Sequence, residues 1–163
     1  MDKATFEHEN LVAFLMMLLR DFASRHRLGT VLGSNAVMQL GDRRFSPEVS
    51  FLQIANEARI RNARVIGPMD MVVEVLSTST RTYDRGDKLK AYRDACVPEI
   101  WLVDPDHERF AAHILAGDGA YSASEISTGS FKSLALSGFE LKVGLLTAAA
   151  QPLGIWRHVR RRH

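Results

Sequence analysis

Three residues of this sequence could together bind a metal ion and a phosphate. Glu74 interrupts the apolar run "DMVVEVL", Glu48 follows Pro47 in "FSPEVSFLQ", and Lys88 lies in the charged segment "DRGDKLKAY". Carboxylate oxygens are the ligands that hard divalent cations such as Mg²⁺ take, and an ammonium group stabilises the negative charge that develops on a reacting phosphate. This combination predicts a metal site for phosphate chemistry, provided that the fold brings the three side chains together.

Glu74 is the most informative of the three. Side chains alternate between the two faces of a strand, so Asp70, Val72 and Glu74 share one side of segment 70–76 and the residues between them share the other. An ionised carboxylate inside a covered sheet is costly unless it is paired or binds a metal. The alternatives to a functional Glu74 are a structural ion pair or a strand end open to water.

The other candidates each have an ordinary structural explanation. Glu48 could be a solvated residue at the start of a strand, and Lys88 could face solvent from the first turn of a helix. Asp70 is either an outer metal ligand or the solvated start of its strand. Asp84 is expected to cap the helix that carries Lys88, and Ser77 either contacts a phosphate or simply belongs to a polar loop.

The elements that must position these residues follow from the apolar pattern. Apolar residues recur at helical spacing over 6–26, and Gly29 ends this long helix. Segment 72–76 is almost continuously apolar, which is typical of a central strand covered on both faces. The other expected elements are strands at 30–32, 36–40 and 48–53, a short helix or mobile loop within 54–68, an amphipathic helix from Asp84 that Pro98 stops, a strand in 99–104, its hairpin partner in 109–116, and a strand near 120–126.

This order of elements predicts a mixed-sheet α/β or α+β fold. One strand–helix–strand crossover is expected from Asp70 to Asp104. The chain has 163 residues, which suits a single domain spanning 1–163.

Composition favours a folded, water-soluble protein, with 46% hydrophobic and 25% charged residues. The single cysteine, Cys96, cannot form an internal disulfide, no signal-peptide pattern is present, and the apolar run 11–19 is too short to span a bilayer. We therefore expect a cytoplasmic protein with no membrane partner. The net charge of +2 permits a polyanionic partner, and the basic segment 157–163 is either a frayed, disordered tail or one that contacts phosphates.

Other chemistries lack their motifs. The sequence has no glycine-rich phosphate loop, no Gly-x-Ser-x-Gly elbow and no Cys-x-x-Cys or His-x-x-x-His pair. The six histidines are scattered, which argues against a zinc site. Cys96 is expected to be a small buried residue near a helix end.

Three stretches resemble the PD-(D/E)XK nuclease superfamily and, within it, the Uma-type family. "SPEVSFL" is similar to a segment in which the family shows Pro-Asp-Val, and "LALSGFELKVGLL" carries its C-terminal Leu-x-x-Phe/Leu-Glu-Leu pattern. Between them, "MDMVVEVLSTSTRTYDRGDKLKAYRDACVPEIWLVDP" looks like the family's central block almost residue for residue. The resemblance runs from about His8 to Leu146.

The resemblance implies a restriction-endonuclease-like core, in which a mixed central β-sheet is flanked by helices and acids on two adjacent strands bind Mg²⁺ or Mn²⁺ for the hydrolysis of DNA. Carried over by position, Glu48 takes the place of the first acid and Glu74 is the second, with the backbone carbonyl of Val75 as a further metal ligand. The superfamily's lysine position, two residues after the second acid, holds Leu76 here. The resemblance therefore assigns the lysine's role to Lys88.

Two departures from the family pattern bear on turnover. Glu48 is one methylene longer than the family's aspartate, which displaces the carboxylate in a site that tolerates little misplacement. Family members also carry an acid before the first helix, which here is replaced by Glu7 or Glu9 or is missing. A catalytically impaired relative that acts as a nucleic-acid-binding or assembly module, and a plain oligomerisation domain, remain alternatives. An active enzyme is expected to be a homodimer, because cutting both strands of a duplex requires two sites, and the strands after Pro105 could form the interface.

Overall fold

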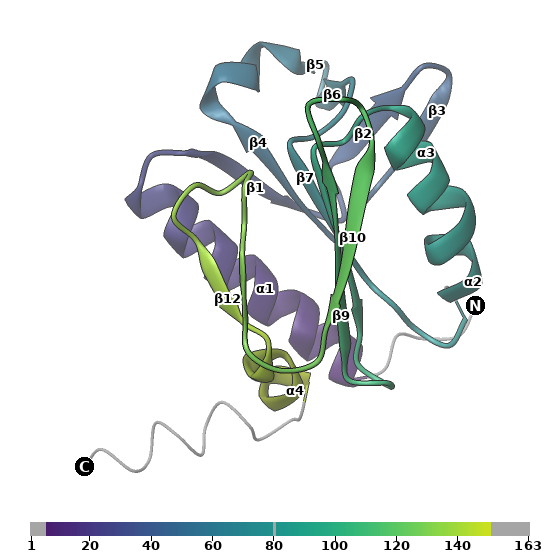
Figure 1. Ribbon diagram of the computed structural model, residues 1–163. Helices are drawn as coiled ribbons and strands as arrows, with labels where there is room; N and C mark the ends of the chain where they lie inside the picture. The colour runs from purple at the N-terminus through teal and green to yellow at the C-terminus, as the bar shows by residue number, and fades with distance from the viewer. Residues whose placement is uncertain (1–5, 80, 151–163) are drawn as a thin grey trace.

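The computed structural model describes residues 6–79 and 81–150, so the basic segment 157–163 lies outside the described residues. A six-stranded sheet with the order β1-β4-β7-β8-β9-β10 runs through the molecule, with helices on both of its faces (Figure 1). β7 and β8 are parallel and the other neighbours are antiparallel, which confirms the predicted mixed sheet. The strands are β1 (Gly29–Gly33), β4 (Val49–Gln53), β7 (Met71–Val75), β8 (Glu99–Asp104), β9 (Arg109–Leu115) and β10 (Tyr121–Ile126).

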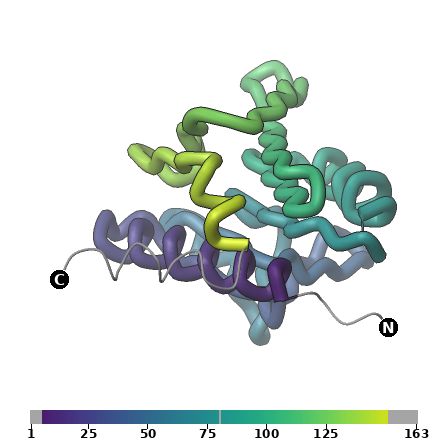
Figure 2. Tube along the Cα trace, turned by 90° about the horizontal axis from the view of Figure 1, so that it is seen from below, coloured from purple at the N-terminus to yellow at the C-terminus, as the bar shows by residue number. Residues whose placement is uncertain are grey.

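The predicted N-terminal helix is α1 (Phe6–Arg25), and it covers one face of the sheet. Its leucines at positions 11, 15 and 19 are buried because residues four apart lie on one side of a helix. They pack in one core cluster with Met71, Val73 and Val75 of β7. The C-terminal helix α4 (Gly144–Ala150) lies beside α1 on this face (Figure 2).

The crossover from β7 to β8 covers the opposite face and is helical from Arg81 onwards. It consists of α2 (Arg81–Tyr83), a π-helical turn η2 (Asp84–Lys88) and α3 (Leu89–Asp94). Val72 and Leu76 of the β7 segment pack with Tyr92 of α3 in the second core cluster, so the alternation predicted for segment 70–76 is present. Cys96, just after α3, is exposed with a φ of 57°, which corrects the expectation of a buried cysteine.

A smaller four-stranded sheet lies at one end of the main sheet, at the top of Figure 1. Segment 54–68, left open between a helix and a loop, forms a 3-10 helix and a short hairpin. Two short strands that come after β10 in the chain form a separate two-stranded sheet. The elements are β2 (Val37–Leu40), β3 (Arg43–Phe45), η1 (Ile54–Arg59), β5 (Ile60–Arg61), β6 (Arg64–Ile66), β11 (Ser130–Lys132) and β12 (Glu140–Lys142). Among the residues that the structure describes, no helix is long and apolar enough to span a membrane.

Candidate active site

The two predicted acids lie on neighbouring antiparallel strands. Val49 of β4 pairs with Val73 of β7 in the ladder. Continuing this register by one residue brings Glu48, which directly precedes β4, level with Glu74. Both carboxylates therefore lie near the carboxyl end of β7, where the chain enters the crossover.

Glu74 is almost completely buried, with 1% of its surface exposed. The Tyr92 hydroxyl donates a hydrogen bond of 2.6 Å to Glu74 Oε1, and Lys88 Nζ donates one of 3.1 Å to Oε2. Burial raises the pKa of the Glu74 carboxyl to about 7, although Lys88 and the Tyr92 hydrogen bond act in the opposite direction. The negative charge of this residue is thus costly here, and an additional cation would lower that cost.

Lys88 bridges two buried carboxylates. Its Nζ lies 3.1 Å from Glu74 Oε2 and 2.9 Å from Asp84 Oδ1. Burial alone would lower the pKa of Lys88, but the attraction of Glu74 and Asp84 outweighs it and raises the pKa above its usual value. Lys88 is therefore a fixed positive charge, suited to stabilising an anion rather than to accepting a proton.

Asp84 does not cap the helix, contrary to the sequence-based expectation. The crossover helix begins earlier, at Arg81, and the position before η2 is Tyr83, which makes no side-chain cap hydrogen bond. Asp84 instead lies inside the helical segment, buried, and its side chain points to Lys88. π-helical turns occur mostly as single insertions and often at functional sites, which fits the position of η2 beside Glu74.

Sequence reasoning missed His8. This residue is buried at 6% exposure in the first turn of α1. Its Nε2 lies 3.0 Å from the carbonyl oxygen of Val75 and 3.6 Å from Glu48 Oε1. A carbonyl can only accept, so Nε2 carries the proton in this contact. The available signal was its spacing, because His8 continues the buried stripe of Leu11 and Leu15 on α1.

Glu48 is partly open to solvent, with 30% of its side chain exposed. Burial raises the pKa of its carboxyl, and the charges of His8 and Lys88 partly offset this effect. Glu9 lies one residue beyond His8, 68% exposed, with Oε1 3.7 Å from His8 Nδ1. Of the two acids considered for the first helix, Glu9 is thus the one that an observed contact places beside His8.

Asp70 and Ser77 have other partners. The Asp70 oxygens accept hydrogen bonds of 2.7 Å from the Gln53 backbone N–H and 2.8 Å from the Asn56 amide, which tie β7 to η1. Four residues of extended strand separate Asp70 from Glu74, a rise of roughly 13 Å. Ser77 follows β7, and its hydroxyl lies 3.1 Å from that of Ser79. Asp70 therefore has a structural explanation that needs no metal.

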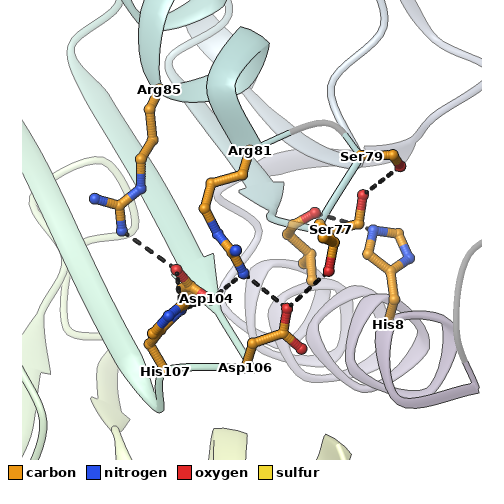
Figure 3. A network of polar contacts seen from close by, with 10 residues as sticks. His8, Ser77, Ser79, Arg81, Arg85, Asp104, Asp106 and His107 are labelled. Atoms are coloured by element: carbon orange, nitrogen blue, oxygen red, sulfur yellow. Dashed lines mark hydrogen bonds and ion pairs between the residues drawn. The ribbon is translucent and has the colours of Figure 1, made fainter.

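A further buried carboxylate, Asp104, lies at the same end of the sheet. Asp104 ends β8, next to β7, and its side chain is 3% exposed. Figure 3 shows Arg81, Arg85 and His107 converging on it, at 3.0, 3.5 and 3.1 Å. Arg81 also donates to Asp106 at 2.7 Å. Burial alone would raise the pKa of the Asp104 carboxyl, but the hydrogen bonds from His107 and Arg81 outweigh it and lower the pKa below its usual value.

One face of the crossover helix carries the side chains that contact both Glu74 and Asp104. Arg81 and Arg85 are four residues apart and reach Asp104, whereas Asp84 and Lys88 are four apart and lie at Glu74. Residues at this spacing share a side of a helix. The Asp104 cluster thus fixes the segment that presents Lys88. The repeated spacing of "RTYDRGDK" was the sequence signal for it.

Glu99 shows what a purely structural buried carboxylate looks like in this fold. It begins β8 and is fully buried. Its oxygens accept hydrogen bonds from Trp101 Nε1 at 2.7 Å and from the backbone N–H groups of Leu134 and Ala135 at 2.8 Å. These neutral donors tie β8 to the segment before β12. Glu74 differs because one of its partners is a lysine, which also contacts a second acid, Asp84.

The donor set near Glu74 suits a hard divalent cation in chemical type. Glu48, Glu74 and the Val75 carbonyl offer only oxygen, which Mg²⁺ and Mn²⁺ prefer. Burial also raises the pKa of Glu74, because it makes the negative charge of the carboxylate costly, and a bound cation would reduce that cost. Within residues 6–79 and 81–150, no three His, Cys, Asp or Glu side chains cluster closely enough to form a complete metal cage. The candidate donors are therefore two carboxylates and a carbonyl, fewer than the six ligands that such a cation takes.

Comparisons with known proteins give the family and a similar fold. A family model described as Uma2, "Putative restriction endonuclease", matches residues 1–144. A solved structure described as a putative nuclease belonging to DUF820, from Anabaena variabilis ATCC 29413, superposes with a TM-score of 0.75 at 14% sequence identity, covering 93% of this chain and 84% of that one. The comparison with curated proteins gave no match.

Proposed function

Because this chain belongs to the Uma2 family of putative restriction endonucleases, we propose that it is a metal-dependent endonuclease that hydrolyses phosphodiester bonds in DNA. The family supports a nuclease, and restriction-endonuclease-like proteins generally use divalent metals. The observation that carries the finer proposal is the buried Glu74, bound by Tyr92 and Lys88 and level with Glu48.

The proposed metal is Mg²⁺ or Mn²⁺, held by Glu48, Glu74 and the carbonyl of Val75. When bound, it supplies Lewis-acid chemistry at the scissile phosphate. Lys88 remains an ammonium group and offsets the negative charge that grows on the phosphate as water attacks in line. Glu48, which is more exposed than Glu74, would orient that water by accepting a hydrogen bond.

His8 and Asp84 act as positioning residues in this proposal. His8 donates to the Val75 carbonyl and lies beside Glu48, so it holds two of the three proposed ligands relative to α1. Asp84 keeps Lys88 charged and directed at Glu74. We further propose that 1–163 acts as one domain, since both core clusters share strands β7 and β8. Cutting both strands of a duplex would require two copies.

The test is cleavage of supercoiled plasmid by the purified full chain with Mg²⁺ or Mn²⁺, with EDTA as the metal-free control. Glu74→Gln keeps the shape of the side chain and removes its charge, so it should reduce cleavage by about 100-fold or more. Glu125→Gln, which changes an exposed residue of β10, is the matched control and should cut at the wild-type rate. Equal cleavage by Glu74→Gln would place the activity elsewhere or in a contaminant.

One observation favours the second candidate, a catalytically impaired DNA-binding relative. Both Glu74 oxygens and the Val75 carbonyl already have partners in the protein, namely Lys88, Tyr92 and His8. If these partners keep the metal out, DNA binding measured by fluorescence anisotropy should be the same with EDTA and with Mg²⁺, and no cleavage should follow.

A further inference from the structure

A cavity of about 620 Å³ opens beside Glu48. Its walls come from three parts of the chain: the side of α1 that carries Val12 and Met16, the turn between β1 and β2, and the hairpin of β5 and β6. This volume lies in the range of sites that hold small organic molecules, about 300–1,000 Å³. The cavity is therefore large enough for a nucleoside-sized ligand next to the candidate active site.

The lining is mostly apolar and carries more negative than positive charge. Val12, Met16, Leu32 and Val65 contribute apolar wall. The ionisable groups of the lining are two carboxylates, Glu9 and Glu48, and one guanidinium, Arg64. Arg64 Nη1 already donates to Gln39 Oε1, at 3.4 Å. A phosphate or another anion is disfavoured in such a cavity, whereas a flat neutral group with N–H donors on its edge is favoured.

Resting on the proposed nuclease function, we propose that this cavity binds one nucleobase of the DNA substrate, turned out of the base stack beside the scissile phosphate. Apolar side chains such as Val12 and Met16 would cover the faces of the base, and the Glu9 carboxylate would accept a hydrogen bond from its exocyclic amino group. Enzymes that read an extruded base use this combination of apolar contact and edge hydrogen bonds.

The proposal commits to a base for two reasons. The cavity is continuous with Glu48, so a group bound in it is within reach of the nucleotide whose phosphate lies at Glu74 and Lys88. The sugar–phosphate backbone is excluded by the two carboxylates, which leaves the base as the part of the nucleotide that fits. Adenine, cytosine and guanine carry an exocyclic amino group and thymine does not, so thymine should bind most weakly.

The inference also predicts the preferred form of the DNA. Extruding a base costs least when the base is already unpaired. Single-stranded or bulged DNA should therefore be cut faster than a fully paired duplex of the same sequence. This preference should disappear when the cavity is filled.

The direct experiment is a titration of the metal-free, ¹⁵N-labelled full chain with deoxyadenosine, deoxycytidine or thymidine, followed by the amide signals of residues that line the cavity. These probes carry no phosphate, so they test the cavity alone. We expect deoxyadenosine and deoxycytidine to bind about tenfold more tightly than thymidine, as one hydrogen bond to a charged acceptor would give. Glu9→Gln should reduce this difference.

Ala13→Phe fills the cavity from an exposed position of α1 and should weaken deoxyadenosine binding at least about tenfold. Met17→Phe adds an aromatic ring at a position of the same helix that is 59% exposed and not part of the lining, so it is the matched control. Its affinity should stay within about twofold of the wild type. Both variants should keep the wild-type thermal unfolding temperature, which separates a filled cavity from a misfolded chain.

Three outcomes overturn the inference: no shift of cavity amides with any nucleoside, equal affinity for thymidine and deoxyadenosine, or binding of the apolar probe indole without binding of nucleosides. Cleavage that depends on Glu74 together with absent nucleoside binding would refute the base site and leave the nuclease intact. Nucleoside binding in a protein that cuts no DNA would refute the nuclease and leave the base site without its proposed substrate.

Discussion

The Asp104 cluster predicts a specific loss of stability with a specific dependence on pH. Asp104→Asn keeps the shape of a side chain that is 3% exposed and removes the charge on which Arg81, Arg85 and His107 converge. A hydrogen bond to a charged group contributes about 1.5–3 kcal/mol and a neutral one about 0.5–1.5 kcal/mol. Each well-placed donor therefore loses about 1 kcal/mol when the charge is removed.

Two of the three donors are well placed. Arg81 and His107 lie at 3.0 and 3.1 Å, whereas Arg85 lies at 3.5 Å and contributes little. Side-chain exposures of 25% for Arg81 and 53% for His107 mean that water screens part of the interaction. The expected loss in the free energy of unfolding is about 1–2 kcal/mol, or about 2–8 °C in melting temperature for a chain of this size.

The pH dependence follows from the lowered pKa of Asp104. The stabilisation is fully present above the ordinary pKa of 3.8 and is lost as pH falls through the lower pKa of the folded state, where the carboxyl takes up a proton. The difference between wild type and Asp104→Asn should therefore be present at pH 5 and should shrink below about pH 3.

The assay is urea unfolding of the wild type, Asp104→Asn, Arg81→Met and the double variant, at three pH values. The cycle should give a coupling of up to about 1 kcal/mol between Asp104 and Arg81. Asp106→Asn is the control, because Asp106 also accepts from Arg81 but its side chain is 51% exposed, and it should cost at most about 1 kcal/mol. An equal loss in Asp106→Asn, or a loss from Asp104→Asn that is unchanged at low pH, would refute the reasoning.

Further substitutions at Tyr92, Lys88 and Glu99 test the roles assigned to these three residues. Tyr92→Phe removes a 2.6 Å hydrogen bond to a buried carboxylate and should lower the free energy of unfolding by about 2 kcal/mol in urea; a change below about 0.5 kcal/mol would show that water replaces the hydroxyl. Lys88→Met should reduce plasmid cleavage by about 100-fold. Lys88→Arg should recover only part of the lost activity, because a guanidinium does not fit the position of a compact ammonium group. Full activity in Lys88→Met would show that the lysine takes no part in the mechanism. Glu99→Gln should cost about 2 kcal/mol, followed by Trp101 fluorescence, while the folded protein cuts at the wild-type rate; loss of cleavage without loss of stability would contradict its structural assignment.

The fold was predictable where one local pattern decided an element. Leucines spaced four apart predicted α1, and the apolar run around Glu74 predicted β7 as a strand covered on both faces. The small sheet was harder to predict, because β5 and β6 are only two and three residues long and join the sheet through the pairing of β6 with β2, which is remote in sequence. The position of Asp84 was mispredicted for a similar reason. A polar residue before an apolar run is typical of a helix cap, but here the helix begins earlier, and Asp84 is buried inside it, where it pairs with Lys88.

The candidate site shows both the use and the limit of reasoning from single residues. A carboxylate in an apolar strand was the signal that identified Glu74, yet Glu99 in "VPEIWLV" meets the same criterion and is satisfied by neutral donors. What separates them is the charge of their partners, because Glu74 has a lysine and a second acid, which come from a helix 10 to 14 residues further along the chain. A lysine and aspartate four residues apart after the strand supply that information in the sequence. A buried carboxylate therefore indicates a functional site only when the element that follows brings a cation and a further acid to it. Asp104 contacts two arginines of the same helix, which shows that ion pairs of this kind can also hold the helix in place.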